Sequence, residues 1–249
     1  MEKAGSITSI ILEEIKEIIK PGISTQDIDN FCQERLLFYN AISGSLGYNG
    51  FPKYLCTSVN NIVCHGVPNS ETILHNGDII SVDLVLQHDG YFGDSCITYA
   101  VGEITYNLSR LINVCYQAMW DTIELIRPGL HIGDLGYSMM SIAKSNGYDV
   151  IRDFCGHTID NIMHKEPNIP FLGYQGQGPK LKTDMFITIE PMLVTKSPSI
   201  RILSDGWSAK TRDNGYASQF EHTVHVTQTG YNVLTYNYLD TLNNKPKTK

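Results

Sequence analysis

Residues Leu74–Asp83 read LHNGDIISVD, and residues Leu181–Glu190, 107 positions further along the chain, read LKTDMFITIE. Both stretches start with leucine, both contain a short run of β-branched residues, and both end in a carboxylate. Similarity at a fixed internal offset is typical of a chain built from related units. The sequence therefore predicts two related halves whose matching residues meet at a pseudo-symmetric seam.

The same offset relates a second pair of segments. Residues 20–22 (KPG) are followed by Asp27, and residues 127–129 (RPG) are followed by Asp134. No low-complexity linker separates the halves, so we expect them to pack as one body. The expected organisation is a single domain over residues 1–249, with halves at about 1–107 and 108–240 and a frayed, disordered tail at 241–249.

The composition restricts the class of protein. The 249 residues are 42% hydrophobic and carry a net charge of −7, as in a globular protein with a sizeable core. The negative charge argues against a nucleic-acid surface. No apolar run reaches the roughly 20 residues that span a bilayer, so we expect no membrane insertion.

The six cysteines include no CxxC pair, and the chain shows no signal peptide. We interpret them as reduced thiols of a cytoplasmic protein.

Hydrophobic periodicity predicts an α+β protein in which helices precede strands in each half. In the first half the expected helices cover about 7–19 and 24–39, and the expected strands about 54–59, 78–86 and 91–101, with a glycine-rich turn region at 44–52. In the second half the helices cover about 109–126 and 132–145, and the strands lie near 150, 185–190, 216–227 and 231–234.

Asp83 lies within the run at 79–86, which otherwise resembles a buried strand, and Asp94 lies on the return strand. Both are at similar distances from the turn at 88–90, so a simple hairpin would place them opposite each other on one face. An isolated pair of this kind is more often a solvent-facing pair on an exposed hairpin. If it is half-buried, both carboxylates stay ionised only with a cation between them.

The second half favours the cation. Glu190 occupies the position that matches Asp83, and Glu221 lies in a further strand, as Asp94 does in the first half. Four acids at one seam would repel each other strongly unless about two divalent ions lay among them, as in paired-metal hydrolases. The sequence therefore predicts a dinuclear metal site.

Three histidines accompany the acids. His157 follows Gly156, while NIVCH ending at His65 and NIMH ending at His164 match through the repeat. Both His65 and His164 precede a proline by three residues, so we expect them on similar turns that face the cleft. Oxygen and nitrogen ligands together suit Mn, Fe, Co or Zn. The remaining histidines are assigned ordinary structural roles: His75, His88, His131, His222 and His225.

These motifs are similar, in order and spacing, to those of the type I methionine aminopeptidases, from residue 3 to about residue 234. The segments that carry the resemblance are VCHGVP at 63–68, VD at 82–83 with GD at 93–94, GH at 156–157, IEPM at 189–192 and QFEHT at 219–223. The resemblance implies the pita-bread fold, with two pseudo-symmetric halves around a central antiparallel sheet.

By that resemblance Asp94 and Glu221 would bridge two divalent ions. Asp83 would chelate one ion, and His157 with Glu190 would complete the other. The implied reaction is removal of the initiator methionine from nascent peptides and proteins with a small second residue, through attack by a hydroxide bound to both metals. Glu190 would shuttle the proton, while His164 would stabilise the oxyanion and His65 would contact the scissile amide.

The resemblance also implies a narrow apolar pocket for the methionine side chain. The matching positions are Tyr48, Phe51, Cys56, Met163 and Trp207. The sequence departs from the family after Gly156-His157, where residues 158–161 read TIDN instead of a glycine-rich continuation. The bulk and charge of this segment put the shape of the pocket and the affinity for substrate in question.

Two alternatives stay open. One is a proline-directed aminopeptidase or dipeptidase of the same fold, although such enzymes usually carry an extra N-terminal domain. The other is a non-catalytic relative that binds peptides or ribosomes, although such relatives typically lose metal ligands. For the methionine aminopeptidase we expect a monomer that acts on nascent N-termini, with at most transient ribosome contact, no nucleic-acid substrate and no membrane partner.

Overall fold

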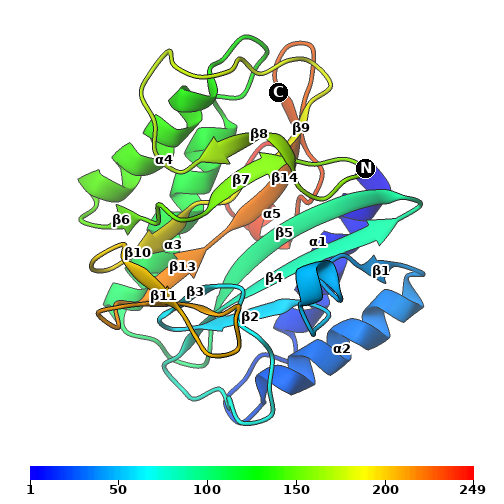
Figure 1. The fold of residues 1–249 in the computed structure, drawn as a ribbon, viewed down its shortest axis with the longest axis vertical. Coiled ribbons are helices and arrows are strands. Elements are labelled where there is room, and N and C mark those ends of the chain that lie inside the picture. Colours follow the sequence, from blue (N-terminus) through cyan, green and yellow to red (C-terminus); the bar gives the residue numbers. More distant parts are fainter.

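The computed structural model describes all residues from Met1 to Lys249. A central antiparallel sheet is covered on one side by helices, as the sequence predicts for an α+β chain (Figure 1). The helices are α1 (Glu2–Lys16), α2 (Thr25–Phe38), α3 (Tyr106–Ile123), α4 (Ile132–Ser145) and α5 (Tyr238–Leu242), with one 3-10 turn, η1 (Tyr48–Gly50).

The central sheet has nine strands, seven of them in the order β1-β4-β5-β14-β9-β7-β8, while β2 pairs with β4 and β15 with β14. Its strands are β1 (Ile42–Ser43), β2 (Cys56–Val59), β4 (Ile79–His88), β5 (Tyr91–Ala100), β7 (Cys155–Thr158), β8 (Lys165–Pro170), β9 (Phe186–Ile189), β14 (Glu221–Val226) and β15 (Tyr231–Val233). Strand β14, from near the end of the chain, lies between the first-half strand β5 and the second-half strand β9.

Two small sheets lie beside the central one. Their strands are β13 (Ala217–Gln219), β10 (Met192–Val194) and β6 (Asp149–Val150) in one, and β11 (Ile200–Ile202), β12 (Ala209–Thr211) and β3 (Ile62–Cys64) in the other. Because β3 belongs to the first half and β12 to the second, the pairing of these two strands joins the halves.

The predicted repeat is present in the backbone hydrogen bonds. The amide of Gly22 donates to the carbonyl of Leu74 over 2.8 Å, and the amide of Gly129 donates to the carbonyl of Leu181 over 2.9 Å. Both glycines have positive φ, where a side chain would be strained. The KPG and RPG segments therefore make equivalent turns that lead into α2 and α4.

The side chains that begin these helices are equivalent too. Asp27 accepts a hydrogen bond from the amide of Ser24 over 2.9 Å, and Asp134 accepts one from the amide of His131 over 3.0 Å. A carboxylate in the first turn satisfies an otherwise unpaired donor and interacts favourably with the helix dipole. The matching aspartates of the sequence repeat are thus helix caps and lie outside the seam.

The halves differ in the segment between their acids. Asp83 and Asp94 are 11 positions apart, whereas Glu190 and Glu221 are 31 positions apart. The longer segment forms β10, β11, β12 and β13. This extension carries Trp207 across to the first half, which the regular repeat alone would not do.

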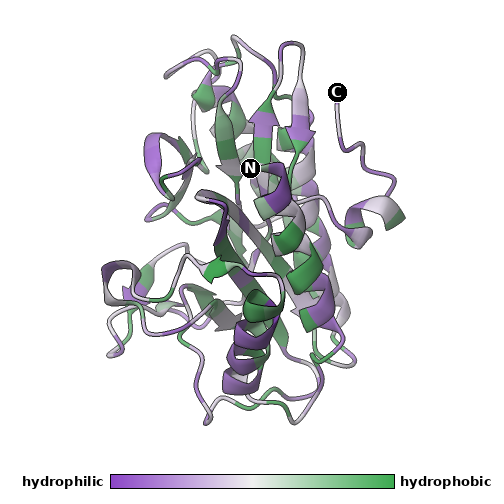
Figure 2. Ribbon diagram, turned by 90° about the vertical axis from the view of Figure 1, so that its right-hand side faces the viewer, coloured by the Kyte–Doolittle hydropathy of each residue, from purple (hydrophilic) through white to green (hydrophobic).

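Helices α1 and α3 cover the same side of the sheet and turn their apolar faces toward it (Figure 2). Ile11, Leu12 and Ile15 of α1 are fully buried, as is Trp120 of α3. Helix α3 starts three residues before the predicted boundary because Thr105 caps it, its hydroxyl accepting from the amide of Leu108 over 3.4 Å.

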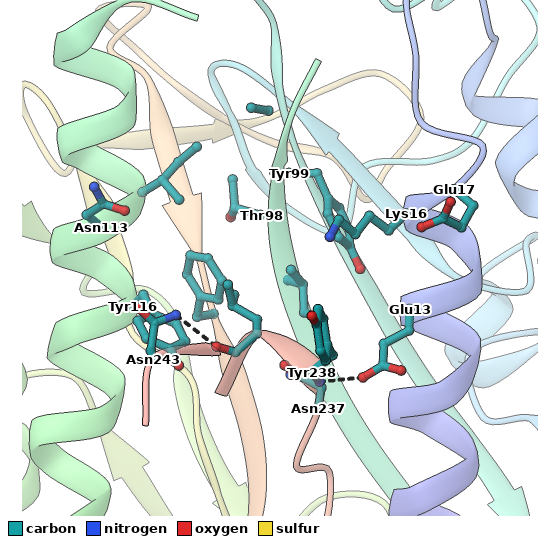
Figure 3. A pocket seen from close by; sticks show the side chains of 15 residues that line it. Glu13, Lys16, Glu17, Thr98, Tyr99, Asn113, Tyr116, Asn237, Tyr238 and Asn243 are labelled. Carbon is teal, nitrogen blue, oxygen red and sulfur yellow. Dashed lines mark hydrogen bonds between the residues drawn. The ribbon is translucent and has the colours of Figure 1, made fainter. Parts of the chain in front are cut away.

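A cavity of about 350 Å³ lies on this helical side, between α1 and α3 (Figure 3). Tyr99 and Phe220 contribute to its lining, and α5 closes one end with Tyr238. Strand residues alternate between faces, so Tyr99 lies on the helical side while Asp94 and Cys96 of the same strand face the other way. The predicted site residues therefore lie on the side of the sheet that the helices leave open.

For residues 241–249 the sequence predicts a frayed tail. In the structure α5 continues to Leu242, and the carbonyl of Lys247 accepts a hydrogen bond from the amide of Val233 over 2.9 Å. Lys249 exchanges backbone hydrogen bonds with Tyr231. The tail thus differs from the expectation because β15 offers it a free edge.

All six cysteines are free thiols, five of them buried. None of the five helices combines the length and the apolar composition needed to cross a bilayer.

Candidate metal centre and adjoining pocket

The first two acids lie on the β4–β5 hairpin, which closes with His88 paired to Tyr91. The predicted register was wrong: Asp83 pairs with Cys96, and Asp94 pairs with Val85. The turn is centred one residue later than the sequence pattern indicated. Such a shift moves the pairing by two positions and keeps the facing parity, so the two carboxylates are diagonal neighbours on the same face.

Strand β14 brings the second pair of acids to the same face. Glu221 pairs with Cys96 of β5, and His222 pairs with Ile189 of β9. Glu190 directly follows Ile189, so it lies beside Glu221 in the next position across the sheet. The order of strands β4, β5, β14 and β9 therefore aligns acids from both halves.

One cavity of about 220 Å³ collects these side chains with the three predicted histidines. Its lining residues are His65, Asp83, Asp94, Asp153, Phe154, Cys155, His157, His164, Glu190, Met192, Gln219 and Glu221. Asp94, Glu190 and Glu221 are each less than 10% exposed. The structure thus brings together every predicted ligand and both predicted catalytic histidines.

The carboxyl groups are strongly destabilised in their charged form. Burial raises the pKa of Asp83 to about 7 and, together with the charge of Asp83, the pKa of Glu190 to about 8. Burial and the neighbouring acids raise the pKa of Asp94 and of Glu221 well above the ordinary values. Glu190 and Glu221 are close enough to share a side-chain hydrogen bond, which requires a proton on one of them.

His157 is held rigidly beside the acids. Its amide donates to Thr188 Oγ1 over 2.9 Å, and that hydroxyl donates to Glu190 Oε1 over 2.7 Å. Its Nε2 lies 3.7 Å from both Asp94 Oδ2 and Glu190 Oε1, too far for a hydrogen bond. Burial, with a contribution from His164, lowers the pKa of His157 to about 3, so the imidazole is a neutral potential ligand.

These residues fit a divalent metal ion. Asp94, His157 and Glu221 each offer a ligand atom, and the three atoms lie within 4.8 Å of one another. The buried Gln219 Oε1 has no hydrogen-bond partner and lines the same cavity. A cation would compensate carboxylates that the protein itself leaves unpaired.

An adjoining pocket of about 280 Å³ shares His65 and His164 with the acidic cavity. Its lining residues are Ser45, Tyr48, Asn49, Phe51, Cys56, His65, Asp83, Val85, Asp94, Met163, His164 and Trp207. All five predicted pocket residues are among them. Phe51 and Trp207 make an edge-to-face contact with ring centroids 5.2 Å apart, which stiffens one wall.

Trp207 reaches the pocket from the β11–β12 connection. Asp205 Oδ1 accepts from the amides of Trp207 and Ser208, each over 2.9 Å. Ser208 Oγ in turn accepts from the amide of Val67 over 3.2 Å. These bonds fasten the second-half extension to the segment that follows His65.

His65 adopts a positive φ of 54° at the end of β3. Its ring lies edge-to-face against Phe154, with centroids 5.1 Å apart. Burial, with a smaller contribution from His164, lowers the pKa of His65 to about 4, so it is neutral near pH 7.

The TIDN segment at residues 158–161, which departs from the family pattern, lines neither cavity. Thr158 donates to the carbonyl of Pro167 over 3.1 Å, and Asp160 forms an ion pair with Lys165. The carbonyl of Asp160 accepts from the amide of Phe92 over 2.8 Å. The side chains of Thr158 and Asp160, which we expected to affect the pocket, therefore make local contacts instead.

Sequence reasoning missed several lining residues. Met192 and Gln219 lie two positions from Glu190 and Glu221, so strand periodicity could have indicated that they share the same side. Phe154 and Cys155 directly precede the Gly156-His157 motif. The other residues not predicted are Ser45, Asn49, Val85 and Asp153. None of these four residues belongs to a motif that the sequence analysis singled out.

The remaining histidines lie outside both cavities. His222 is fully buried on the helical side, where its Nδ1 is 2.9 Å from Thr235 Oγ1. His75, His88, His131 and His225 lie near carboxylates or backbone carbonyls on other parts of the surface and the sheet.

Comparison with protein families gives a match to the model of metallopeptidase family M24 over residues 1–228. A methionine aminopeptidase from Rickettsia prowazekii is 41% identical over 94% of this chain and 91% of that protein. Methionine aminopeptidase A from Synechocystis is 40% identical over 94% and 93%, and the Escherichia coli enzyme is 34% identical over 97% and 92%.

Solved structures agree. The crystal structure of the Rickettsia prowazekii methionine aminopeptidase has a TM-score of 0.93 and 40% identity, covering 94% of this chain and 95% of that one. A prolidase from Pyrococcus horikoshii has a TM-score of 0.71 at 21% identity and covers 95% and 60%. The likeness to the prolidase concerns the fold alone. The pita-bread prediction is confirmed. Because the relatives of higher identity are methionine aminopeptidases, the proline-directed alternative is not favoured.

Proposed function

The chain belongs to metallopeptidase family M24 and, within it, to the methionine aminopeptidases, and on this premise we propose that it removes the initiator methionine from peptides and nascent proteins whose second residue is small. It is a hydrolase with a divalent metal cofactor. The observation that carries the proposal is the junction of a cavity lined by buried acids with a largely apolar pocket of about 280 Å³.

We propose that two ions, of Co, Mn, Fe or Zn, are held by Asp83, Asp94, His157, Glu190 and Glu221. When bound, such a pair supplies Lewis-acid charge and lowers the pKa of water toward neutrality. The buried acids repel each other without it, which gives the cluster a strong preference for cations.

The methionine side chain would occupy the apolar pocket. Tyr48, Phe51 and Trp207 provide ring surfaces, while Cys56 and the flexible Met163 complete the lining. Since His65 and His164 lie at the border of the two cavities, the scissile amide of a methionine bound there would lie between them and the acids.

The protein groups at that border can handle protons and charge. Glu190 would carry a proton between the attacking water and the leaving amine, a role that a carboxylate beside the metal ions can fill. His164 would donate a hydrogen bond to the oxygen that gains charge, and His65 would contact the amide. Both imidazoles are neutral because burial lowers their pKa.

A peptide assay separates the candidate functions. The protein, prepared without oxygen, is loaded with Mn, Co or Fe and incubated with Met-Ala-Ser, Met-Pro and Xaa-Pro peptides. Release of methionine from Met-Ala-Ser supports the proposal, and cleavage confined to Xaa-Pro bonds would replace it with the proline-directed activity. No release with any metal would favour a peptide-binding or ribosome-binding protein.

We propose further that the chain acts as a monomer in the cytoplasm and contacts ribosomes only transiently. Light scattering and ribosome co-sedimentation test these two points. A stable dimer or a salt-resistant ribosome complex would contradict them.

A further inference from the structure

Tyr48 lines the apolar pocket, but its hydroxyl also makes a polar contact. Its Oη lies 2.8 Å from His164 Nδ1, within hydrogen-bond distance, and neither side chain makes another hydrogen bond. The two rings are tilted, with centroids 5.2 Å apart. The contact therefore links a pocket wall to an imidazole that also lines the acidic cavity.

The loop around Tyr48 is shaped to hold it there. Gly47, Asn49 and Gly50 all have positive φ, of 82°, 48° and 86°. The amide of Gly47 donates to the carbonyl of Phe51 over 2.8 Å, and the amide of Phe51 donates to the carbonyl of Tyr48 over 2.9 Å. A Cβ at either glycine would meet no atom within 4 Å, so backbone conformation, and not lack of space, selects glycine here.

The hydrogen bond restricts the tautomer of His164. A neutral imidazole carries one proton, on one of its two nitrogens. Nδ1 is engaged by Tyr48, which leaves Nε2 as the free nitrogen. A phenol hydroxyl is a better hydrogen-bond donor than acceptor, so donation from Tyr48 to Nδ1 is favoured, and this leaves the proton on Nε2.

We propose that Tyr48 is a positioning residue: its hydroxyl donates to Nδ1 of His164 and holds the imidazole in the tautomer with the proton on Nε2, ready to donate to the oxygen of the scissile bond. The inference rests on the proposed function for its catalytic consequence. No proton is transferred between the two residues. Tyr48 thereby joins recognition of the methionine side chain to the orientation of the group that meets the reacting oxygen.

Tyr48→Phe separates this role from that of a pocket wall, because it removes the hydroxyl and keeps the ring. The loss of one hydrogen bond should lower kcat about threefold to tenfold on Met-Ala-Ser. The KM should stay within about twofold, since the apolar contact with methionine is kept. Tyr174→Phe is the matched control, because Tyr174 is exposed and lines neither cavity, and it should leave both constants unchanged.

The tautomer itself is read by NMR of protein with ¹⁵N-labelled histidine, free of metal and loaded with Zn²⁺, in which the shifts of Nδ1 and Nε2 differ between tautomers. His164 is assigned by comparison with His164→Ala. We expect the Nε2–H form to predominate in the unsubstituted protein and to lose population in Tyr48→Phe, but not in Tyr174→Phe.

A predominant Nδ1–H form in the unsubstituted protein would overturn the proposal, even if the variant did not fold. The same tautomer population in Tyr48→Phe, or an unchanged kcat, would also overturn it. If the unsubstituted protein released no methionine from any peptide, the proposed function would fail, while the NMR measurement would still decide the hydrogen bond.

Discussion

Two regions of this molecule bury aspartate or glutamate side chains, and they differ in how many hydrogen-bond donors surround the buried carboxylates. On the helical side, Asp240 has no exposed surface and accepts hydrogen bonds from Tyr116 Oη and Trp120 Nε1, each over 2.9 Å. His222 Nε2 lies 3.3 Å from its other oxygen. Burial alone would raise the pKa of Asp240, but His222 and these donors outweigh burial and lower it.

On the open side, the four acids of the candidate site have almost no such partners. Thr188 donates to Glu190, while the other carboxyl groups meet mainly one another. Burial and the neighbouring acids therefore raise their pKa values. The protein compensates the buried carboxylate of Asp240 but leaves the four acids of the candidate site uncompensated. A cation bound from solution would supply the positive charge that this site lacks.

The largest expected effect contrasts two isosteric substitutions. Asp94→Asn should lower kcat/KM by more than about a hundredfold, because even partners outside the ligand shell cost that much in metal sites. It should also stabilise the metal-free protein at pH 8, since it removes a carboxyl group whose charged form is destabilised by burial and by the neighbouring acids. Asp240→Asn should instead lower the free energy of unfolding by about 1–3 kcal/mol, because it weakens a satisfied network.

Thermal unfolding of both variants with and without chelator checks this contrast. Equal destabilisation of the metal-free protein by both substitutions would remove the distinction between the two regions.

His164→Ala tests a residue at the border of the cavity that is not expected to hold metal. Turnover should fall about a hundredfold, as for loss of an oxyanion donor, while metal affinity should change little. Steady-state kinetics and metal titration on one preparation provide the comparison. An equal loss in turnover and in metal binding would refute the assigned role.

The pH dependence of stability should have opposite signs in the two regions. The raised pKa values of Asp83 and Glu190, about 7 and about 8, mean that the folded metal-free protein holds protons that the unfolded chain has released. Its free energy of unfolding should therefore fall as pH rises from about 4 to 8. The lowered pKa of Asp240 gives stability above its ordinary value that is lost in more acidic solution.

Added divalent metal should cancel the loss near pH 8, because cations replace the bound protons. Urea unfolding of the chelated and the metal-loaded protein at pH 5, 6.5 and 8 measures both curves. Parallel curves would mean that the acids titrate normally.

The smallest expected effect concerns the wall between the apolar pocket and its surroundings. Met163 and Tyr48 line both this pocket and an open hollow beside it. Met163→Ala should join the two spaces and raise the relative kcat/KM for a first residue of leucine or phenylalanine about tenfold, since a change of one methylene group in an apolar pocket alters selectivity by about 1–3 kcal/mol. Competition between Met-Ala-Ser and Leu-Ala-Ser measures the change, and unchanged selectivity would show that Met163 does not set the wall.

The sequence predicted the open side of the molecule better than the helical side. The repeat pointed to Asp83 and Glu190 because equivalent positions recur at one offset, and the motifs brought in His157 and the pocket residues. The hairpin register was missed because the turn length at His88–Tyr91 decides it. Met192 and Gln219 were not predicted as lining residues because neither side chain can ionise.

The compensation of Asp240 was out of reach for a different reason. Its partners Tyr116, Trp120 and His222 come from α3 and β14, more than 100 positions away in the case of α3. No periodic pattern connects such positions, and only the packing of α5 against the sheet brings them together. Long-range side-chain networks of this kind follow from the fold and leave little trace in a single sequence.

The central claim is that the seam between the halves neutralises its acids with cations from solution. Equilibrium dialysis of chelated protein against Mn²⁺ or Co²⁺ at pH 7.5 without oxygen tests it most directly, with Asp94→Asn and Asp240→Asn beside the unsubstituted chain. We expect two ions per chain in the unsubstituted protein and in Asp240→Asn, and fewer in Asp94→Asn. No bound metal, or the same number in all three proteins, would contradict it.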